Sequence, residues 1–180
     1  MKIKVENLRR IQDENTKLVG VADIVLNDTI KIRTIKIIKW NNSLIVTMPS
    51  KKIKEQYKDV AHPTIIELRN QITNAVLNAY NYSVMEEGIL EEMYVSDVRV
   101  SIVEHERLKA IVSIALNGNF AIEYSHFIYN GIAPDGGSNY GLAFQVDQNS
   151  IPYVVILKDS LKTEILEKSL KAYKEIIEKS

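Results

Sequence analysis

An internal repeat constrains the fold of this chain more than any other sequence feature. Residues 18–27 align with residues 108–117, and both segments are apolar, partly alternating runs that end at an asparagine. At the same spacing of 90 residues, the tripeptide Asn-Leu-Arg at 7–9 aligns with Asp-Val-Arg at 97–99. Near the end of each copy the spacing becomes 93 residues, and there Leu68, Ile72, Leu77 and Tyr80 match Leu161, Ile165, Leu170 and Tyr173. The chain is therefore predicted to contain two copies of one small unit, with connecting loops that differ in net length by three residues.

The first copy predicts strands followed by one helix. Apolar runs at 19–26 and 30–39 flank Asn27-Asp28, a turn signal that predicts a hairpin, and the alternation changes phase near Thr34, as at a β-bulge. After a turn at Asn41-Asn42, residues 44–48 predict a short strand, and residues 49–63 predict a polar loop. Pro63 suits the first position of a helix, and apolar residues then recur at three- and four-residue spacing as far as Tyr80.

The second copy differs from the first in its loops. Residues 131–138 form a turn-rich insertion, which is rich in glycine but lacks the Lys-Ser/Thr ending of a phosphate-binding loop. Residues 147–150, Asp-Gln-Asn-Ser, stand where the first copy has its basic loop. The predicted boundaries are 1–83 for the first unit, 84–94 for a connector and 95–180 for the divergent second unit.

Charge is divided unequally between the two halves. Lysine plus arginine and aspartate plus glutamate each total 23, but residues 1–83 hold 14 basic and 8 acidic side chains, against 9 and 15 in residues 84–180. This asymmetry indicates that only the basic half meets a polyanion; the alternatives are chance and an attraction between two faces within the chain. The chain has no cysteine, which excludes disulfides, thiolate metal sites and thiol catalysis. Without a visible signal peptide or an apolar run long enough to cross a membrane, we expect a cytoplasmic protein with no membrane association.

The first copy resembles the SpoVG family (stage V sporulation protein G). The resemblance rests on Met-Pro-Ser-Lys-Lys at 48–52 and Asp-Val-Ala-His-Pro at 59–63, in order and near the family spacing. Leu-Arg-Arg at 8–10, Asn41-Asn42 and Ala-Val-Leu-Asn-Ala-Tyr at 75–80 also match, so the resemblance covers about residues 3–80. The chain departs from the family pattern in having Lys52 for an arginine, Trp40 before the turn and a slightly shorter loop. The second copy shares only the skeleton of strands and helix.

The resemblance implies an α+β fold, in which each SpoVG-like unit is a small antiparallel sheet followed by a C-terminal helix. It also implies a usually homodimeric bacterial regulator that binds DNA or RNA and is linked to sporulation, septation and gene control. Binding in the family is attributed to the basic residues after the Met-Pro-Ser element, which match Lys51, Lys52 and Lys58 here. Lys54 is an additional lysine without a clear family counterpart.

The same loop suggests a nucleic-acid site on chemical grounds. Lys51, Lys52, Lys54 and Lys58 place four ammonium groups within eight residues, and ammonium groups bind phosphates with little base specificity. Ser50 offers a hydroxyl donor, and Tyr57 offers a ring on which an unpaired base could stack. The alternative is a solvated loop, since lysine clusters are common on loops. Lys31, Arg33, Lys36 and Lys39 either extend this surface or form the wet face of a strand.

The remaining polar and aromatic candidates have simpler explanations. His62 suits a capping or packing role, Asp59 either pairs with Lys58 or caps the helix, and Trp40 either stacks on a base or packs in a core or dimer contact. His105 and His126 are isolated and show no metal-ligand spacing. The sequence contains no credible catalytic constellation, so we expect neither enzymatic activity nor a cofactor or metal.

Three functions remain open at this point. The first is a non-enzymatic regulator that binds DNA or RNA. The second is a protein-interaction adaptor in cell division or sporulation without direct nucleic-acid binding, and the third is a small hydrolase. We expect the two copies to pack as an intrachain pseudo-dimer, with corresponding strands meeting across a pseudo-two-fold axis and the second copy mainly structural. Further homo-oligomerisation remains open, as does an arrangement in which each copy pairs with another chain.

Overall fold

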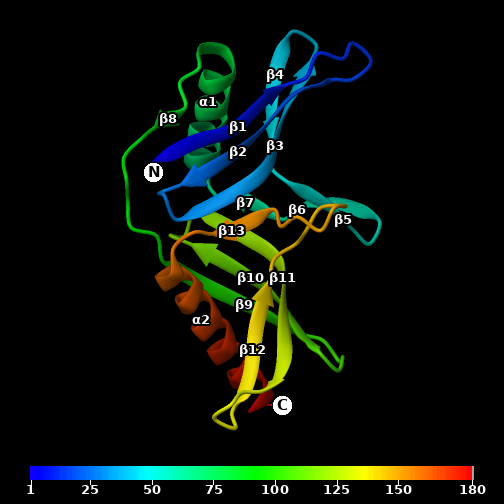
Figure 1. Ribbon diagram of the computed structural model, residues 1–180, viewed down its shortest axis with the longest axis vertical. Coiled ribbons are helices and arrows are strands. Elements are labelled where there is room, and N and C mark those ends of the chain that lie inside the picture. The colour runs from blue at the N-terminus through cyan, green and yellow to red at the C-terminus, as the bar shows by residue number, and fades with distance from the viewer. Residues whose placement is uncertain (180) are drawn as a thin grey trace.

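The computed structural model describes residues 1–179 and consists of two sheet-plus-helix units stacked along the long axis of the molecule (Figure 1). The first unit contains β1 (Ile3–Arg10), β2 (Leu18–Leu26), β3 (Ile30–Trp40), β4 (Ser43–Thr47), β5 (Ser50–Ile53), β6 (Gln56–Asp59), β7 (Ala61–Pro63) and α1 (Ile66–Tyr82). The second contains β9 (Val95–Ile102), β10 (Leu108–Leu116), β11 (Phe120–Ile132), β12 (Ser138–Ala143), β13 (Val154–Ile156) and α2 (Asp159–Ile177), and β8 (Glu86–Glu87) lies between them. The predicted α+β class with two such units is confirmed.

Each unit is built on an antiparallel three-stranded meander. In the first unit β1 pairs with β2 and β2 with β3, and in the second β9 pairs with β10 and β10 with β11. The predicted hairpin turn is confirmed, because Asn27 and Asp28 both adopt left-handed φ angles, 49° and 53°, as a two-residue type I′ turn requires. The predicted bulge is confirmed too: Thr34 has a φ of 65°, and the pairing register of β2 with β3 shifts between Ala22 and Ile24.

The two units exchange their short strands. β7 leaves the first unit and pairs with β11 of the second, while β13 leaves the second unit and pairs with β3 of the first. The registers are equivalent, since Pro63 lies opposite Phe120 and Ile156 lies opposite Ile30. The same interaction thus occurs twice, as in an isologous dimer interface. The predicted pseudo-dimer is observed. The prediction that corresponding strands meet is wrong, because each of the two joints between the units, β7 with β11 and β13 with β3, pairs strands that are not counterparts.

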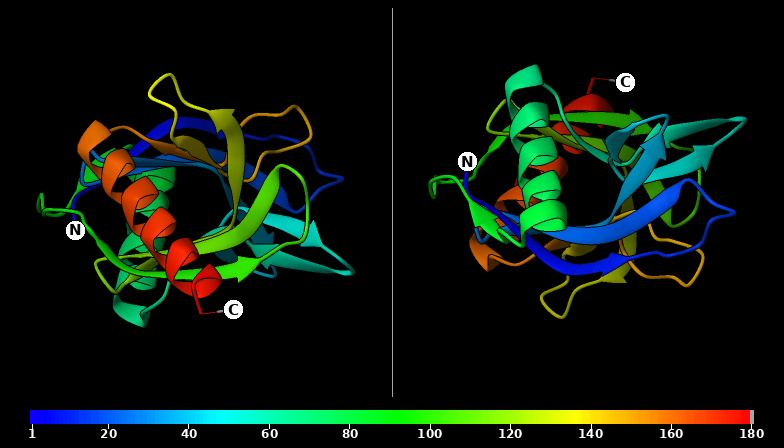
Figure 2. Two further views of the ribbon diagram at one scale, coloured as in Figure 1. Left: turned by 90° about the horizontal axis from the view of Figure 1, so that it is seen from below. Right: turned by 90° about the horizontal axis from the view of Figure 1, so that it is seen from above.

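One continuous hydrophobic core runs through both units. The inner faces of the strands supply Ile24, Ile32, Ile114 and Phe127, all at most 1% exposed. Each helix covers one sheet with a buried stripe, formed by Leu68, Ile72, Ala75, Val76 and Ala79 on α1 and by Leu161, Ile165, Ser169 and Tyr173 on α2. The helices lie towards opposite ends of the molecule (Figures 1 and 2). Because the core is shared, burial of apolar surface holds the units together as well as each unit by itself.

Three predictions about local structure are wrong. Residues 49–63 are not a polar loop, because they form the hairpin of β5 and β6 and then β7. The helix begins at Ile66 rather than at Pro63, which instead lies in β7 opposite Phe120. The alignment of 7–9 with 97–99 is also wrong. Ser113 corresponds to Asp23 of the first unit; Ser113 lies opposite Arg99, whereas Asp23 lies opposite Glu6. The counterpart of Arg99 is therefore Glu6 and not Arg9.

The connector between the units is partly ordered into the first sheet. Glu86 and Glu87 of β8 pair with Lys4 and Ile3 at the edge of β1. Gly88 follows with a φ of 87°, and a side chain there would lie 2.1 Å from the carbonyl oxygen of Met1. The connector therefore passes close to the first strand as it leads to the second unit.

Candidate nucleic-acid interface

The basic segment predicted to bind nucleic acid forms a projecting two-stranded hairpin. β5 and β6 form a sheet of their own, and Figure 1 shows it extending from one side of the molecule. Pairing runs from Ser50 opposite Asp59 to Ile53 opposite Gln56, which leaves Lys54 and Glu55 at the tip. Lys54 adopts a left-handed φ of 56°, so the backbone of the turn, together with the ladder, fixes the direction of the hairpin.

The register of the hairpin sorts the candidate side chains onto two faces. Cross-strand partners share a face, and successive residues alternate between faces. Lys51 lies opposite Lys58 and Lys52 lies opposite Tyr57, so these two pairs point to opposite faces. Ser50, opposite Asp59, shares the face of Lys52 and Tyr57. The structure thus brings the six predicted residues onto one hairpin but divides them between its two sides.

The pairing of Lys51 with Lys58 places like charges directly opposite each other. Such a pair destabilises a sheet, and neither lysine has a carboxylate within ion-pair distance among residues 1–179. Lys54 also lacks a carboxylate partner, whereas Lys52 Nζ lies 3.6 Å from Oε2 of the well-exposed Glu55. The hairpin therefore carries three lysines whose charge no acidic side chain of the described structure balances.

The base of the hairpin contacts the second unit. Burial lowers the pKa of the His126 imidazole in β11, and the charge of the partly buried Lys51 lowers it further. The Nε2 atom of Gln145 lies 3.1 Å from His126 Nε2 and donates to the carbonyl of Tyr124 at 2.6 Å. The amide of Glu123 in β11 donates to the carbonyl of Val60, directly after β6, at 2.9 Å, so the base of the hairpin is held against the second unit.

The equivalent loop of the second unit is shorter and not basic. The amide of Val60 donates to the carbonyl of Pro49 across the base of the first hairpin, and Tyr153 donates to Gln145 at the equivalent place in the second unit. The second loop is organised by Asp147, whose carboxylate accepts from the amides of Asn149 and Ile151. Among the two hairpins, only the first presents lysines, as the sequence predicted.

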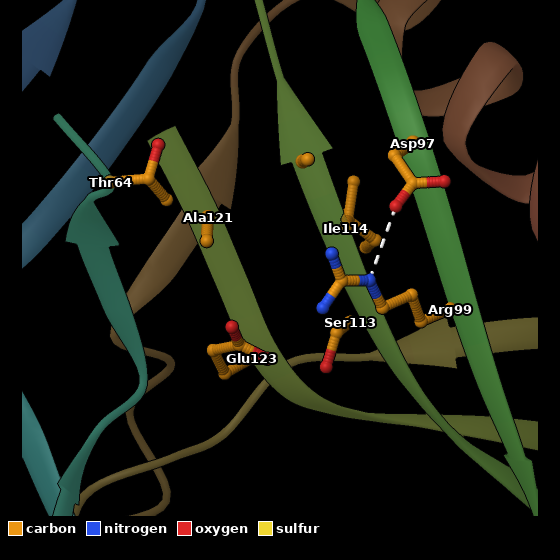
Figure 3. A pocket seen from close by; sticks show the side chains of 8 residues that line it. Thr64, Asp97, Arg99, Ser113, Ile114, Ala121 and Glu123 are labelled. Atoms are coloured by element: carbon orange, nitrogen blue, oxygen red, sulfur yellow. Dashed lines mark hydrogen bonds and ion pairs between the residues drawn. The ribbon is translucent and has the colours of Figure 1, made fainter. Parts of the chain in front are cut away.

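The outer face of the second sheet carries a small polar pocket of about 140 Å³ (Figure 3). Arg99 Nε and Asp97 Oδ2 form an ion pair at 3.2 Å in its lining, which also includes Glu123 and Ser113. Thr64, which follows β7, closes one side, so the pocket combines residues from both units. Apart from Thr64, its residues come from β9, β10 and β11, and only the pairing of these strands brings them together, so no local sequence motif marks the pocket.

His62 is an ion-pair residue rather than a helix cap. Its Nε2 atom lies 3.7 Å from Glu123 across the joint between β7 and β11. Interaction with Glu123 raises the pKa of His62, and the same interaction lowers the pKa of Glu123, with a smaller lowering from Ser113. Asp59 also raises the pKa of His62 and does not cap α1, whose N-cap is Ile65. Glu123 stands between Ser113 and His62, whereas a serine triad requires the histidine in the middle.

The other candidates are distributed over the surface. Trp40 is 52% exposed at the end of β3, and Lys17 Nζ lies 3.8 Å from its ring centroid. Lys31 forms ion pairs with Glu6 and Asp23, so it belongs to the wet face of the sheet. His105 accepts hydrogen bonds from the amides of Arg107 and Leu108 and so organises its own loop.

Residues 1–179 contain neither a group of metal ligands nor a helix that could span a membrane. Within residues 1–179, no three His, Asp or Glu side chains are grouped so that they could hold a metal ion. Neither of the two helices in that range is long and apolar enough to span a membrane.

Comparison with known proteins relates the first unit to one family. Residues 1–82 match the family model SpoVG. A protein of Clostridium botulinum (strain Eklund 17B / Type B) named as a SpoVG septation protein is 31% identical over 93 residues, which cover 51% of this chain and 100% of that protein. A SpoVG septation protein of Clostridioides difficile is also 31% identical over 93 residues, which cover 51% of this chain and 100% of that protein. One of Acholeplasma laidlawii is 35% identical over 81 residues, or 44% of this chain and 85% of that protein. No solved structure matches the chain.

Proposed function

Because this chain belongs to the SpoVG family, we propose that it is a non-enzymatic regulatory protein that binds DNA or RNA through the β5–β6 hairpin. The observation that carries this proposal is the direct pairing of Lys51 with Lys58 on a projecting hairpin, where no carboxylate balances them. Two like charges held side by side repel each other and destabilise the hairpin, and an anion that binds between them relieves this repulsion. Phosphates of a nucleic-acid backbone are anions of the right chemistry, and lysine binds them as a point charge.

The shape of the hairpin favours entry into a groove of a duplex. A two-stranded β-ribbon fits the major groove of B-form DNA, whereas the major groove of A-form RNA is too narrow for side chains to read. The two faces of the hairpin would then meet opposite walls of the groove, with Lys51 and Lys58 on one wall and Lys52 and Tyr57 on the other. Duplex DNA is therefore the preferred partner of the hairpin itself.

The family relationship supports a role in septation or sporulation. The relatives compared above are named as septation proteins, and the first unit of this chain corresponds to the whole of two of them. We extend that association to this chain as part of the same proposal, together with a cytoplasmic location. A regulator of this kind needs neither a cofactor nor a catalytic centre.

A protein-interaction adaptor is the second candidate. An apolar groove of about 390 Å³ lies between α2 and the strands β12 and β13, lined by Leu142, Phe144, Ile156 and Leu166 among others. Lys162 is the charged residue of its lining. An apolar groove with a basic rim could hold a peptide of a division or sporulation partner, and this candidate predicts little affinity for DNA or RNA.

The test replaces Lys51, Lys52, Lys54 and Lys58 with alanine and measures binding to a labelled DNA duplex over a range of salt concentrations. Each lysine that contacts one phosphate contributes about 0.9 to the slope of log affinity against log salt. We therefore expect weaker binding and a slope flatter by about 3 to 4 if all four make such contacts. Thermal unfolding should change little, because these side chains lie outside the core.

A matched control removes the same number of charges elsewhere. Lys158, Lys162, Lys171 and Lys179 are exposed on or beside α2, away from the hairpin. Their replacement with alanine should leave most of the salt slope unchanged. If the two quadruple variants lose the same slope, the hairpin is not the specific contact. If the wild-type chain does not bind at all, the adaptor is favoured.

A further inference from the structure

An open hollow of about 600 Å³ lies at the end of the second unit, where β11 and β12 extend alongside the last turns of α2. Its lining is aromatic and basic, with Glu106 as the acidic member. The residues that matter to its chemistry are Arg107, Lys109, Tyr129, Asn130, Tyr140 and Tyr173. They come from a loop, three strands and a helix, and no local sequence motif unites them.

The aromatic side chains form a preorganised cluster. The ring of Phe127, which is fully buried, lies parallel to Tyr140 at 5.0 Å between centroids and with an interplanar angle of 7°. The centroid of Tyr140 lies 5.6 Å from that of Tyr129 and 5.8 Å from that of Tyr173, and these rings are tilted by 58° and 55° to it. Tyr129 and Tyr140 are also directly opposite each other in the β11–β12 ladder, so the backbone fixes their separation. Rings held in this way can accept another flat ring at little cost in conformational entropy.

The tyrosine hydroxyl groups of the hollow have no partner within residues 1–179. Tyr173 is 8% exposed, its burial raises the pKa of its hydroxyl, and its oxygen forms no hydrogen bond in the described structure. The counterpart in the first unit, Tyr80, has partners for both its hydroxyl group and its ring. Its hydroxyl donates to the carbonyl of Val19 at 3.4 Å, and the guanidinium of Arg10 lies 5.2 Å from its ring. The hollow of the second unit thus retains polar groups that the first unit uses internally.

Two cations border the aromatic cluster. Lys109 Nζ lies 5.9 Å from the centroid of Tyr129 and donates to the carbonyl of His105 at 3.2 Å. Arg107 is exposed, and within residues 1–179 its side chain has no ion-pair partner. The loop that carries Arg107, residues 103–107, projects from the same side of the molecule as the β5–β6 hairpin (Figures 1 and 2). A nucleic acid bound at the hairpin would therefore extend along the side on which the loop lies.

We propose that this hollow is a second binding site, which takes an unpaired nucleobase of a single strand. The base would stack on the ring of Tyr129 beside the tilted ring of Tyr140, with the free tyrosine hydroxyl groups and Asn130 available to its polar edge. Arg107 and Lys109 would hold the adjacent phosphate. Stacking on aromatic rings combined with cations along the backbone is the general chemistry of single-strand recognition. The proposal rests on nucleic-acid binding by this chain, and it gives the second unit a ligand-binding role.

The experiment measures fluorescence anisotropy of a labelled single-stranded DNA and of the same sequence as a duplex. The hollow variant carries Tyr129→Leu and Arg107→Gln. The control variant carries Tyr94→Leu and Arg69→Gln, which remove an exposed tyrosine and an exposed arginine far from the hollow. We expect the hollow variant to bind the single strand about tenfold more weakly and the duplex with little change. The control variant should bind both as the wild-type chain does.

Other outcomes separate this proposal from the one on the hairpin. If the hollow variant binds the single strand as tightly as the wild-type chain, or loses equally on both probes, the site is not a base-stacking site. If the four-lysine hairpin variant keeps its duplex affinity while the hollow variant loses the single strand, the hairpin proposal fails and the hollow stands. A wild-type chain that binds neither probe overturns both. Should the double substitution not fold, Arg107→Gln alone tests the same site with a smaller loss.

Discussion

The ion pair between His62 and Glu123 connects the two units at the level of single residues. His62 lies in β7 of the first unit, opposite Ala121, and Glu123 lies in β11 of the second, directly after the three pairs of residues that form this joint. The place of His62 is taken by Val155 in the other joint, where Val155 lies opposite Lys31. The two joints have the same backbone geometry but different side-chain chemistry, so only one of them is expected to respond to pH near neutrality.

The sign of that response follows from the two pKa shifts. The raised pKa of His62 gives stability that is complete below its ordinary value of 6.5 and is lost as pH rises through the folded value. The lowered pKa of Glu123 gives stability that is complete above its ordinary value of 4.5 and is lost as pH falls through the folded value. The pair therefore contributes most between about pH 4.5 and 6.5. His62→Gln should cost up to about 1 kcal/mol of unfolding free energy in that range.

Urea unfolding of the wild-type chain, His62→Gln, Glu123→Gln and the double variant at pH 5.5 and pH 9 measures this contribution as a double-mutant cycle. We expect a favourable coupling at the lower pH that has disappeared at the higher one, where the imidazole is neutral. A coupling that is the same at both values of pH would show that the two side chains interact by packing and not by charge.

At the scale of elements, the sequence predicts those structures whose signal is local. The hairpin turn at Asn27-Asp28, the bulge at Thr34 and the apolar stripe of α1 all depend on neighbouring residues, and all three are observed. β7 and β13 have three residues each and pair only with strands of the other unit. Their signal is therefore non-local, and residues 61–63 appear as part of a loop until the partner strand is known.

The candidate sites follow the same rule. The six residues of the basic hairpin lie within ten positions of one another, so a motif could find them, although their division between two faces needed the register of β5 with β6. The hollow draws Arg107, Tyr129, Tyr140 and Tyr173 from elements far apart in the chain. The useful sequence signal was the tyrosines on either side of the turn-rich insertion, which become neighbours once β11 and β12 pair.

The turn of the hairpin allows its charge to be separated from its conformation. Lys54 has a φ of 56°, which glycine adopts without the cost of about 1 kcal/mol that a side chain brings. Lys54→Gly and Lys54→Ala remove the same charge, but only Lys54→Gly removes the conformational cost of a side chain at this left-handed φ. We expect both to flatten the salt slope for a DNA duplex by about 0.9 if Lys54 contacts a phosphate.

The two Lys54 variants should differ in the order of the hairpin. Amide hydrogen exchange at Lys51 to Lys58 should be slower in Lys54→Gly than in Lys54→Ala, because the β5–β6 ladder opens less often. If Lys54→Gly binds with wild-type slope, the lysine at the tip does not contact phosphate. If exchange is equal in the two variants, the left-handed turn does not limit the stability of the hairpin.

At the scale of the whole molecule, the chain joins two units in the way that two copies of one unit would. Each joint uses one short strand and the edge of one long strand, and equivalent hydrogen bonds occur in both. Leu157 donates to Thr29 and Thr64 donates to Asn119, while Arg33 donates to Tyr153 and Glu123 donates to Val60. Two of the relatives are one unit long over their whole length, so one such unit suffices to make a protein. We infer that the second unit stands where a second copy of the first would stand in a homodimer.

The isolated first unit, residues 1–83, should therefore form a homodimer. Without the second unit, the edge of β3 at Ile30–Ile32 loses β13, and β7 loses its partner strand. Both losses can be repaired at once, because β7 of one copy can take the place of β13 on β3 of the other. Exposed edges and the apolar surface of the shared core otherwise favour aggregation. Size-exclusion chromatography with light scattering at several concentrations should show a dimer, or an aggregating monomer if β7 cannot replace β13. A stable, well-folded monomer would contradict the view that the exchange of strands holds this fold together.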